Sequence, residues 1–311
     1  MADSSREPLG RGDLAARRAG QLRRRRQRRR RALAAAALVL AAAVLAEVAL
    51  GGGGGGSSRS TARRSPAPGS RAKRRSRGGA EVRNATPQPG WGPHTGPVPI
   101  LEYHVLGRPQ GEVPYPDLYV PRAAFRKQMD WLDDHGYQAV TLEEVEEAWY
   151  HGGTLPPKPI VISFDDGYRP QYTFALPQLR KHGWPGVLNL KAEGSDLYES
   201  NVKAMLAAGW ELAAHTIHHP DLTTLGPEAL DEEVAGSRHI LQREYHVPVK
   251  NFCYPSGRFD EAVIAAVKSA GYEGATTELP GYATRQHPFE LARIEVLGSW
   301  GVSDLAAALR R

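Results

Sequence analysis

The chain has 311 residues and a formal net charge of +6, which is enough length for one large domain or two small ones. Its charge is divided unevenly, with 21 Lys and Arg against 5 Asp and Glu up to residue 90, and 19 against 29 in the rest. The positive total therefore does not indicate a basic globular domain that binds nucleic acid. One cysteine, Cys253, excludes an intrachain disulfide. An extracytoplasmic location stays open, because the acidic part is large enough to fold on an apolar core.

The N-terminal segments predict a membrane anchor. Residues 1–31 form a basic cytoplasmic tail that ends in an arginine-rich run. Residues 32–50 are Ala, Leu and Val, interrupted only by Glu47, and this length is close to the minimum that spans a bilayer as a helix. The arginines beside it favour a transmembrane signal-anchor with its N-terminus in the cytoplasm. A cleaved signal peptide is the alternative, since small residues near Ala46 and Ala49 permit cleavage.

The basic tail also has a nucleic-acid interpretation, which the sequence does not favour. The arginine run has no aromatic residues between its charges to stack on bases. Next to an apolar run of spanning length, membrane topology and contact with anionic lipid explain the charge more simply. Residues 51–97 follow with six consecutive glycines and then Ser, Arg and Pro, a composition that predicts a disordered linker.

From Val98 onward, short apolar runs alternate with amphipathic segments, and Thr141 with Glu144 predicts a helix start. The pattern predicts an α/β domain over residues 98–311 with a mostly parallel sheet. Seven or eight strands suit a distorted (β/α) barrel, closed or incomplete. The predicted strands are 98–103, 138–140, 160–163, 186–190, 211–214, 251–254, 274–277 and 291–296, and the predicted helices are 121–135, 171–182, 200–208, 227–245, 260–270 and 303–309.

Two polar motifs follow apolar strand runs. Asp165 and Asp166 end the 160–163 strand, and Gly167 allows the backbone to turn sharply after them. Adjacent carboxylates at the end of a buried strand repel each other and need a stabilising partner, for which a divalent cation is the usual answer. His215 and His219 follow another strand, and a carboxylate with such a histidine pair gives three ligands and leaves one position open. In a parallel barrel these strand ends converge, together with Tyr254-Pro255-Ser256-Gly257.

The same residues resemble the polysaccharide deacetylase family, carbohydrate esterase family 4, whose catalytic unit is the NodB homology domain. Ser163-Phe164-Asp165-Asp166-Gly167 resembles its first motif, Thr/Ser-Phe-Asp-Asp-Gly, and the run His215 to Pro220 resembles its second, His-Ser/Thr-x-x-His-Pro. Tyr254-Pro255-Ser256-Gly257 resembles part of the third and is a weaker signal. The resemblance extends over residues 98–296 approximately.

The resemblance implies a role for each matched residue. Asp166, His215 and His219 are expected to hold a divalent metal, most simply Zn²⁺, and Asp165 to act as general base. The backbone N–H of Ser256 is expected to help bind the oxyanion, and Thr216 to orient the histidine loop. His218, between the two ligands, is expected to be a bystander.

The chain departs from the family pattern at two places. Cys253 stands where many relatives carry an arginine that orients the base, and Arg293, in the last strand, is the candidate substitute. Leu291-Ala292-Arg293 stands where many relatives have Leu-x-His, whose histidine protonates the leaving amine. His104, at the end of the first strand, is the candidate acid, ahead of His287.

The opening run 99–104 and the ending around Arg293 resemble the subgroup that removes acetyl groups from poly-N-acetylglucosamine exopolysaccharide. Peptidoglycan is the competing substrate, and Tyr115, Tyr119, Trp184 and Trp300 are candidates for sugar stacking, although burial is favoured for each. The resemblance therefore implies a membrane-anchored, extracytoplasmic, metal-dependent polysaccharide N-deacetylase. The alternatives are a metal-containing carbohydrate-binding domain with weak or no turnover, motivated by the missing Leu-x-His, and a basic-tailed nucleic-acid binder.

Overall fold

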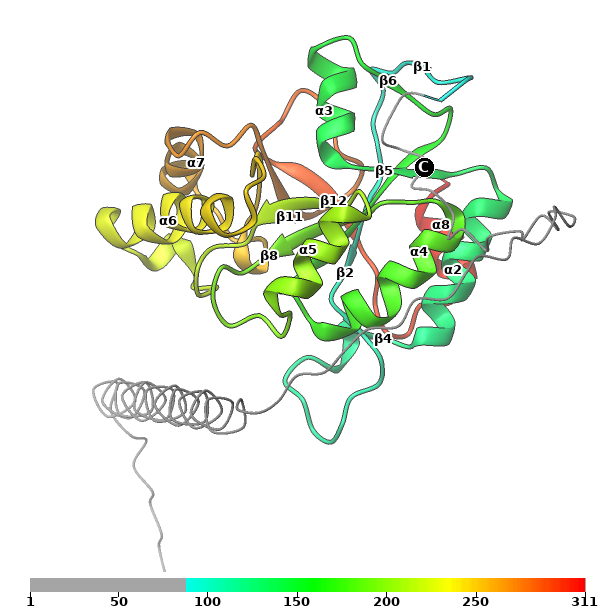
Figure 1. Ribbon diagram of the computed structural model, residues 1–311, viewed down its shortest axis with the longest axis horizontal. Coiled ribbons are helices and arrows are strands. Elements are labelled where there is room, and N and C mark those ends of the chain that lie inside the picture. The colour runs from blue at the N-terminus through cyan, green and yellow to red at the C-terminus, as the bar shows by residue number, and fades with distance from the viewer. Residues whose placement is uncertain (1–87, 311) are drawn as a thin grey trace, which may run out of the picture. The chain divides into compact units, whose positions relative to one another are not determined.

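Parallel strands form the centre of the computed structural model, which describes residues 88–310 (Figure 1). Seven of them follow one another in hydrogen-bonded order around a closed ring, β2-β7-β8-β9-β10-β11-β12 and back to β2. The ring strands are β2 (Ile100–Tyr103), β7 (Pro159–Asp165), β8 (Val187–Leu190), β9 (Glu211–Ala214), β10 (Asn251–Cys253), β11 (Gly274–Pro280) and β12 (Leu291–Glu295).

The eighth strand, β5 (Gln138–Val140), pairs with the first part of β7 and is not a member of the ring. It contacts Pro159–Val161, whereas β8 pairs with the same strand at Ser163–Asp165. The predicted parallel barrel of seven or eight strands is confirmed, with seven strands closing the ring.

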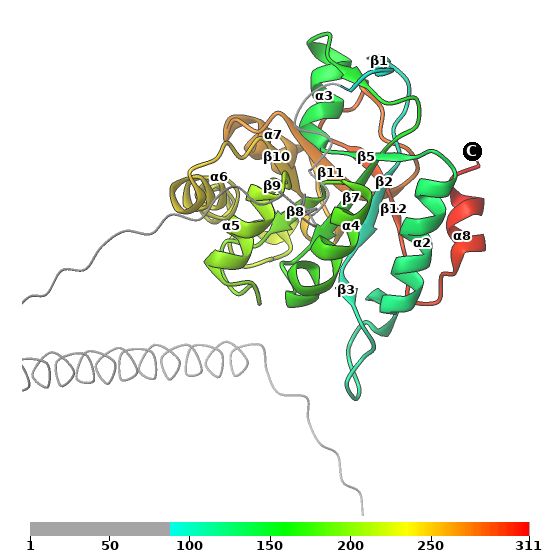
Figure 2. The same ribbon diagram turned by 45° about the vertical axis from the view of Figure 1, so that its right-hand side comes forward.

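Helices surround the barrel, as expected for strands joined by crossovers. In both views α6 and α7 lie together on one side and α2 and α8 on the opposite side, while α3 lies over one end of the barrel (Figures 1 and 2). Their bounds are α2 (Arg122–Asp134), α3 (Leu142–Tyr150), α4 (Leu176–His182), α5 (Glu199–Ala207), α6 (Pro227–Tyr245), α7 (Glu261–Ser269) and α8 (Val302–Ala308).

Local sequence signals explain several helix ends. The Thr141 side chain accepts a hydrogen bond from the Glu144 backbone N–H, and the Glu144 carboxylate accepts one in return, which makes a capping box. Gly183 ends α4 in the left-handed conformation that glycine adopts without a steric penalty. The predicted helix over 171–182 is present, but its first turn, Gln171–Ala175, is π-helical.

The apolar core has two parts. Between the ring and α2, the rings of Tyr103 and Phe125 meet edge-on at 5.1 Å, and Tyr103 stacks on Phe164 at 5.7 Å. The second part lies where the strands begin, and there α3 contributes Val145 and Trp149. Because this end of the barrel is closed by apolar side chains, the carboxyl ends of the strands are left for a functional site.

Two short strand pairings and one register shift were not predicted from the sequence. β1 (Gly92–Pro93) pairs with β6 (Thr154–Leu155), so ordered backbone precedes Val98. β3 (Val105–Leu106) pairs with β4 (Tyr119–Val120), and the loop between them projects from the barrel (Figure 2). The register between β11 and β12 shifts between Thr276 and Pro280.

The predicted signal-anchor over 32–50 and most of the predicted linker lie outside the described residues. Within residues 88–310, none of the helices combines the length and hydropathy of a membrane span.

Candidate active site

The carboxylate pair at the end of β7 sits on unusual backbone. Asp166 has a φ of 72° and Gly167 a φ of 75°, so two successive residues are left-handed. A Cβ at Gly167 would lie 2.6 Å from Leu190 and 2.8 Å from Ser195, which explains the glycine. The other left-handed non-glycine residues among those described are Thr216, His219, His246 and Ser256. All but His246 are in the predicted motifs, and such strained backbone concentrates at functional sites.

The three predicted metal ligands converge. Asp166 Oδ1 lies 3.9 Å from His215 Nε2 and 3.8 Å from His219 Nε2, and one ligand atom from each residue lies within 4.8 Å of the others. Asp166 directly follows β7, whereas both histidines follow β9. A carboxylate and two imidazoles at this spacing are a donor set that suits a divalent cation such as Zn²⁺.

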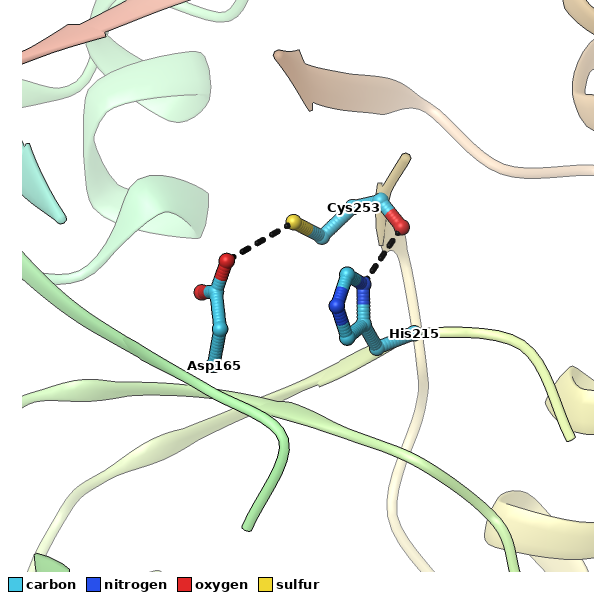
Figure 3. A group of neighbouring side chains, drawn as sticks. All are labelled: Asp165, His215 and Cys253. Atoms are coloured by element: carbon cyan, nitrogen blue, oxygen red, sulfur yellow. Dashed lines mark hydrogen bonds between the residues drawn. The ribbon is translucent and has the colours of Figure 1, made fainter. Parts of the chain in front are cut away.

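His215 is oriented by its other ring nitrogen. Nδ1 lies 2.8 Å from the Cys253 carbonyl oxygen, and because a carbonyl only accepts, Nδ1 carries the proton (Figure 3). Nε2 of the neutral ring is therefore a free electron-pair donor facing Asp166. Burial is the largest influence on the His215 pKa and lowers it to about 4, which keeps the ring neutral.

A positive charge already lies beside the candidate ligands. Lys191 Nζ is 3.3 Å from Asp166 Oδ1. Burial acts to raise the pKa of Asp166, but the nearby His215, Lys191 and His219 outweigh it, so the pKa is lowered. An ionised carboxylate is the form that binds a cation, so the lowered pKa of Asp166 agrees with the metal that the sequence predicts.

A second group of metal-compatible side chains overlaps the first. Asp165, His215 and Cys253 also bring their donor atoms within 4.8 Å (Figure 3). Burial raises the pKa of the Cys253 thiol well above its ordinary value, and a protonated thiol is a poor ligand. The Asp165 oxygens already accept other hydrogen bonds, so the set with Asp166 and His219 fits a metal better.

Arg293 holds Asp165 from across the barrel. Nη1 lies 2.9 Å from Oδ1 and Nη2 lies 3.0 Å from Oδ2, which is a bidentate ion pair with both side chains buried. Asn189 Nδ2 donates to Oδ1 at 2.6 Å, and Cys253 Sγ lies 3.5 Å from Oδ2. The structure thus places Arg293 where the sequence analysis expected the substitute arginine.

These neighbours keep Asp165 ionised. Burial acts to raise its pKa, but Arg293, His104 and His215 outweigh burial and hold the pKa well below its usual range. The carboxylate is therefore ionised at neutral pH.

Glu102 is a charged residue in this centre that sequence reasoning missed. It is fully buried on β2, its Oε1 lies 3.2 Å from Arg293 Nη2, and neither oxygen accepts a hydrogen bond. Burial is the main reason that its pKa is raised well above the ordinary value. His104 Nε2 lies 3.8 Å from Glu102 and 3.9 Å from Asp165 Oδ2, so the predicted acid belongs to the same cluster.

A cavity of about 800 Å³ opens over these groups. Tyr115, which is 71% exposed, and Asp117 come from the β3–β4 loop, and Leu297 follows β12. The remaining wall includes the two aspartates and the candidate acid and ligands, namely His104, Asp165, Asp166, His215, His219 and Ser256. The cavity brings every predicted catalytic and metal-binding residue to one place except Arg293, which lies buried beneath Asp165.

The Ser256 turn is built by close packing. Ser256 has a φ of 52° and Gly257 a φ of 60°, in the turn Pro255–Gly257 after β10. A Cβ at Gly257 would lie 2.5 Å from the Glu278 Cβ, so only glycine allows this approach. The turn brings Ser256 to the cavity wall, where its predicted backbone role is sterically feasible.

The histidine loop is tied together by its own residues. The fully buried Thr216 accepts a hydrogen bond from the His219 N–H at 2.8 Å, which is the kind of contact that its predicted orienting role requires. His218 also lines the cavity, and its Nδ1 lies 2.7 Å from Glu233 Oε1. Glu233 also accepts from the backbone N–H groups of Ile217 and His218.

The fold and this site define a class of protein: a parallel-barrel hydrolase with a candidate metal centre at the carboxyl ends of its strands. The profile of the family described as polysaccharide deacetylase matches residues 152–275. YxkH of Bacillus subtilis, a protein assigned to the polysaccharide deacetylases, is 32% identical over 204 residues, which cover 64% of this chain and 71% of that protein. The chain belongs to the polysaccharide deacetylase family and is a hydrolase of carbohydrate esterase family 4.

Two further relatives bear on the proposals below. The poly-beta-1,6-N-acetyl-D-glucosamine N-deacetylase of Escherichia coli K12 is 43% identical over 68 residues, which cover 22% of this chain and 10% of that protein. Among solved structures, BC0361, a polysaccharide deacetylase from Bacillus cereus, is 26% identical with a TM-score of 0.61, and the match covers 69% of each chain.

Proposed function

We propose that this protein is a metal-dependent N-deacetylase that removes acetyl groups from an N-acetylglucosamine-containing polysaccharide outside the cell membrane. The observation that carries the proposal is the meeting of Asp165, held by Arg293, with the ligand set Asp166, His215 and His219 in one cavity. A bound divalent cation, most simply Zn²⁺, supplies Lewis-acid chemistry that polarises the amide carbonyl and acidifies water.

Asp165 is the base in this proposal. Its carboxylate is ionised because Arg293 and other neighbours lower its pKa, and its two oxygens are fixed by hydrogen bonds from Arg293 and Asn189. A fixed, charged carboxylate next to the ligand set can accept the proton of the attacking water without first rearranging. The two adjacent aspartates thus divide the work, one taking a proton and the other holding the cation.

Ser256 and His104 act on the substrate oxygen and nitrogen in this proposal. The backbone N–H of Ser256, on the cavity wall, donates to the carbonyl oxygen as negative charge develops there. His104 lies on the same wall, and its Nε2 is 3.9 Å from Asp165 Oδ2. It is placed to receive the proton from the base side and give it to the leaving amine, the task of the histidine that Leu291-Ala292-Arg293 lacks.

The substrate and the location rest on the relatives and the sequence. Similarity to the Escherichia coli poly-beta-1,6-N-acetyl-D-glucosamine N-deacetylase over 68 residues favours an exopolysaccharide of that type. Peptidoglycan is the second candidate polymer. The apolar run over 32–50 behind its arginines favours a single-pass anchor with the hydrolase domain outside, and the linker then gives this domain reach.

Acetate release from defined glycans tests the proposal. Zinc-loaded protein is incubated with N-acetylglucosamine oligomers of β-1,6 and β-1,4 linkage and with purified peptidoglycan, and acetate is measured enzymatically. Release that stops with a chelator and returns with Zn²⁺ supports the proposal. Absence of acetate from every metal-loaded reaction would refute it. Glycan binding that Asp165→Asn leaves unchanged, with no acetate released, would instead support the carbohydrate-binding alternative.

A further inference from the structure

A second cavity of about 460 Å³ lies beside the first. The two share Glu278, Glu295 and Leu297 as common walls. Trp300 and Tyr282 line the second cavity on its far side. A cavity of this size with an aromatic wall is large enough for a small ligand, and its shared wall places any occupant next to the candidate catalytic centre.

The second cavity forms where two strands separate. The pairing of β11 with β12 shifts between Thr276 and Pro280, and Glu278 lies in the shifted stretch. Gly281, at the end of this stretch, has a φ of 150°, a conformation open to glycine. Irregular pairing of this kind is frequent at barrel rims next to active sites, where it redirects a side chain. Here it puts the carboxylate of Glu278 on the wall between the two cavities.

The charge on this wall is unbalanced. Glu278 and Glu295 are both exposed, and within residues 88–310 neither carboxylate makes a side-chain hydrogen bond or an ion pair. Partial burial raises the pKa of Glu278, Arg293 acts to lower it, and repulsion from Glu295 adds to the increase. Arg293 is the one cation that lines the second cavity, but its guanidinium is buried and already paired with Asp165 and Glu102.

The cationic side chains of the first cavity do not balance the negative charge of Glu278 and Glu295. Lys191 pairs with Asp166, and Arg258 pairs with Asp221 at 2.6 Å. The two wall carboxylates therefore favour a ligand that brings its own positive charge. Deacetylation makes such a group, because an amino sugar without its acetyl carries an ammonium at neutral pH.

We propose that the second cavity is a subsite for an already deacetylated sugar, whose ammonium lies between Glu278 and Glu295 while its ring packs on Trp300. The inference rests on the proposed function and deepens it. The enzyme then prefers an N-acetylated unit that has a deacetylated neighbour in the same polymer, so each turnover improves the binding of the next stretch. Deacetylation would be clustered along the chain of sugars.

Binding tests the subsite independently of turnover. A glucosamine tetramer and its fully N-acetylated counterpart are titrated by calorimetry, at low and high salt, against zinc-loaded protein that carries Asp165→Asn to prevent turnover. We expect the glucosamine tetramer to bind more tightly, and Glu278→Gln or Glu295→Gln to weaken it about threefold each at low salt, the range of exposed ion pairs. Binding of the acetylated tetramer should not change. Glu232→Gln, on the exposed side of α6, is the matched control and should change neither.

Kinetics then separates the two proposals. The same variants are assayed on fully acetylated and on half-deacetylated tetramers. A higher kcat/KM for the half-deacetylated tetramer, lost in the Glu278→Gln/Glu295→Gln double variant, supports the subsite. Equal binding of the two tetramers by the Asp165→Asn protein with both glutamates in place, or a kinetic preference that survives the double variant, would overturn the subsite while leaving the deacetylase intact. If no substrate releases acetate, the proposed function fails, and the binding titration still decides the subsite.

Discussion

Arg293 on β12 contacts Asp165 on β7 through two parallel hydrogen bonds, of 2.9 and 3.0 Å, inside the barrel. The residues around Arg293 form no motif that indicates this contact, because the arginine lies in a mainly apolar strand. The guanidinium also lies 3.2 Å from Glu102 and donates through Nε to the Thr277 carbonyl. One arginine therefore fixes the proposed base and contacts a second buried acid.

Arg293→Lys should keep the charge and lose the bidentate geometry. We expect kcat to fall about 100-fold, because a lysine cannot hold both Asp165 oxygens and the base loses its orientation. Metal content, measured by elemental analysis, should stay the same. Arg293→Met should in addition destabilise the fold by about 3–5 kcal/mol, since it leaves buried acids unpaired. Full activity of the lysine variant would show that the ion pair has only a structural role.

The two adjacent aspartates should separate into two phenotypes. Asp165→Asn should keep its metal and lose acetate release, whereas Asp166→Asn should lose metal affinity as well, because Asp166 faces both histidines. The two substitutions are matched in chemistry and differ by one position. Zinc titration monitored by calorimetry, together with acetate release, distinguishes them. Equal metal loss in both variants would contradict the separate roles.

His104→Gln tests the proposed acid. Loss of a general acid typically costs ~10²–10⁴ in rate, and the cost should appear with amide substrates, whose leaving amine needs a proton. Hydrolysis of 4-nitrophenyl acetate should be much less affected, because its leaving group departs unprotonated. The exposed His287, replaced by glutamine, is the control. A uniform loss on both substrates would indicate that His104 only supports the fold.

A buried acid at the closed end of the barrel predicts that stability falls as pH rises. Asn251 Nδ2 donates to Glu146 Oε2 at 3.0 Å, while Glu146 Oε1 and Asn251 Oδ1 have no partner. A Cβ at Gly274 would collide with both of these oxygens, so they share one small space, and a proton on Glu146 would join them. Burial raises the Glu146 pKa from 4.5 to about 7.

The direction of the pH dependence follows from the raised pKa of Glu146. The folded state binds the proton more tightly than the unfolded state, so the contribution of Glu146 to the free energy of unfolding is full below pH 4.5 and is lost as pH approaches 7. The loss amounts to about 3 kcal/mol at most. Urea unfolding across this range should show a smaller decline in Glu146→Gln, whose amide pairs with Asn251 without a titrating proton. Glu147→Gln, exposed on the same helix, should behave like the unmodified protein. Other acids with raised pKa values, among them Glu211 at about 8 and the fully buried Glu102, contribute to the decline that remains.

Much of the fold was predictable because its signals are local. Apolar β-branched runs mark the barrel strands, and the predicted α6 agrees with the observed bounds at both ends. Since parallel strands bring their carboxyl ends together, the meeting of Asp166 with His215 and His219 followed from the same reasoning. The closure of the ring through β2 and β7 was left open, because it depends on pairings between residues about sixty positions apart.

The functional residues that were not predicted are those whose role depends on the direction in which a side chain leaves its strand. Glu102 lies in an apolar run and gives no sign that it turns into the barrel toward Arg293. Asn189 and Lys191 follow the rule of polar groups at strand ends, and applying that rule to the strand over 186–190 would have found them. The position of the Glu278 and Glu295 carboxylates depends on the register shift between β11 and β12. No local sequence pattern predicts that shift.

The arginine on β12 has a consequence for how such enzymes are recognised. In a closed barrel, the inward-facing side chains of all strands point toward one axis. A guanidinium can therefore come from any of several strands and still reach the same carboxylate. Loss of a signature residue at Cys253 is then offset by an arginine forty positions later in the chain. Surveys that score each signature segment separately would count this chain as deficient, whereas its assembled centre has the group that the segment lacks.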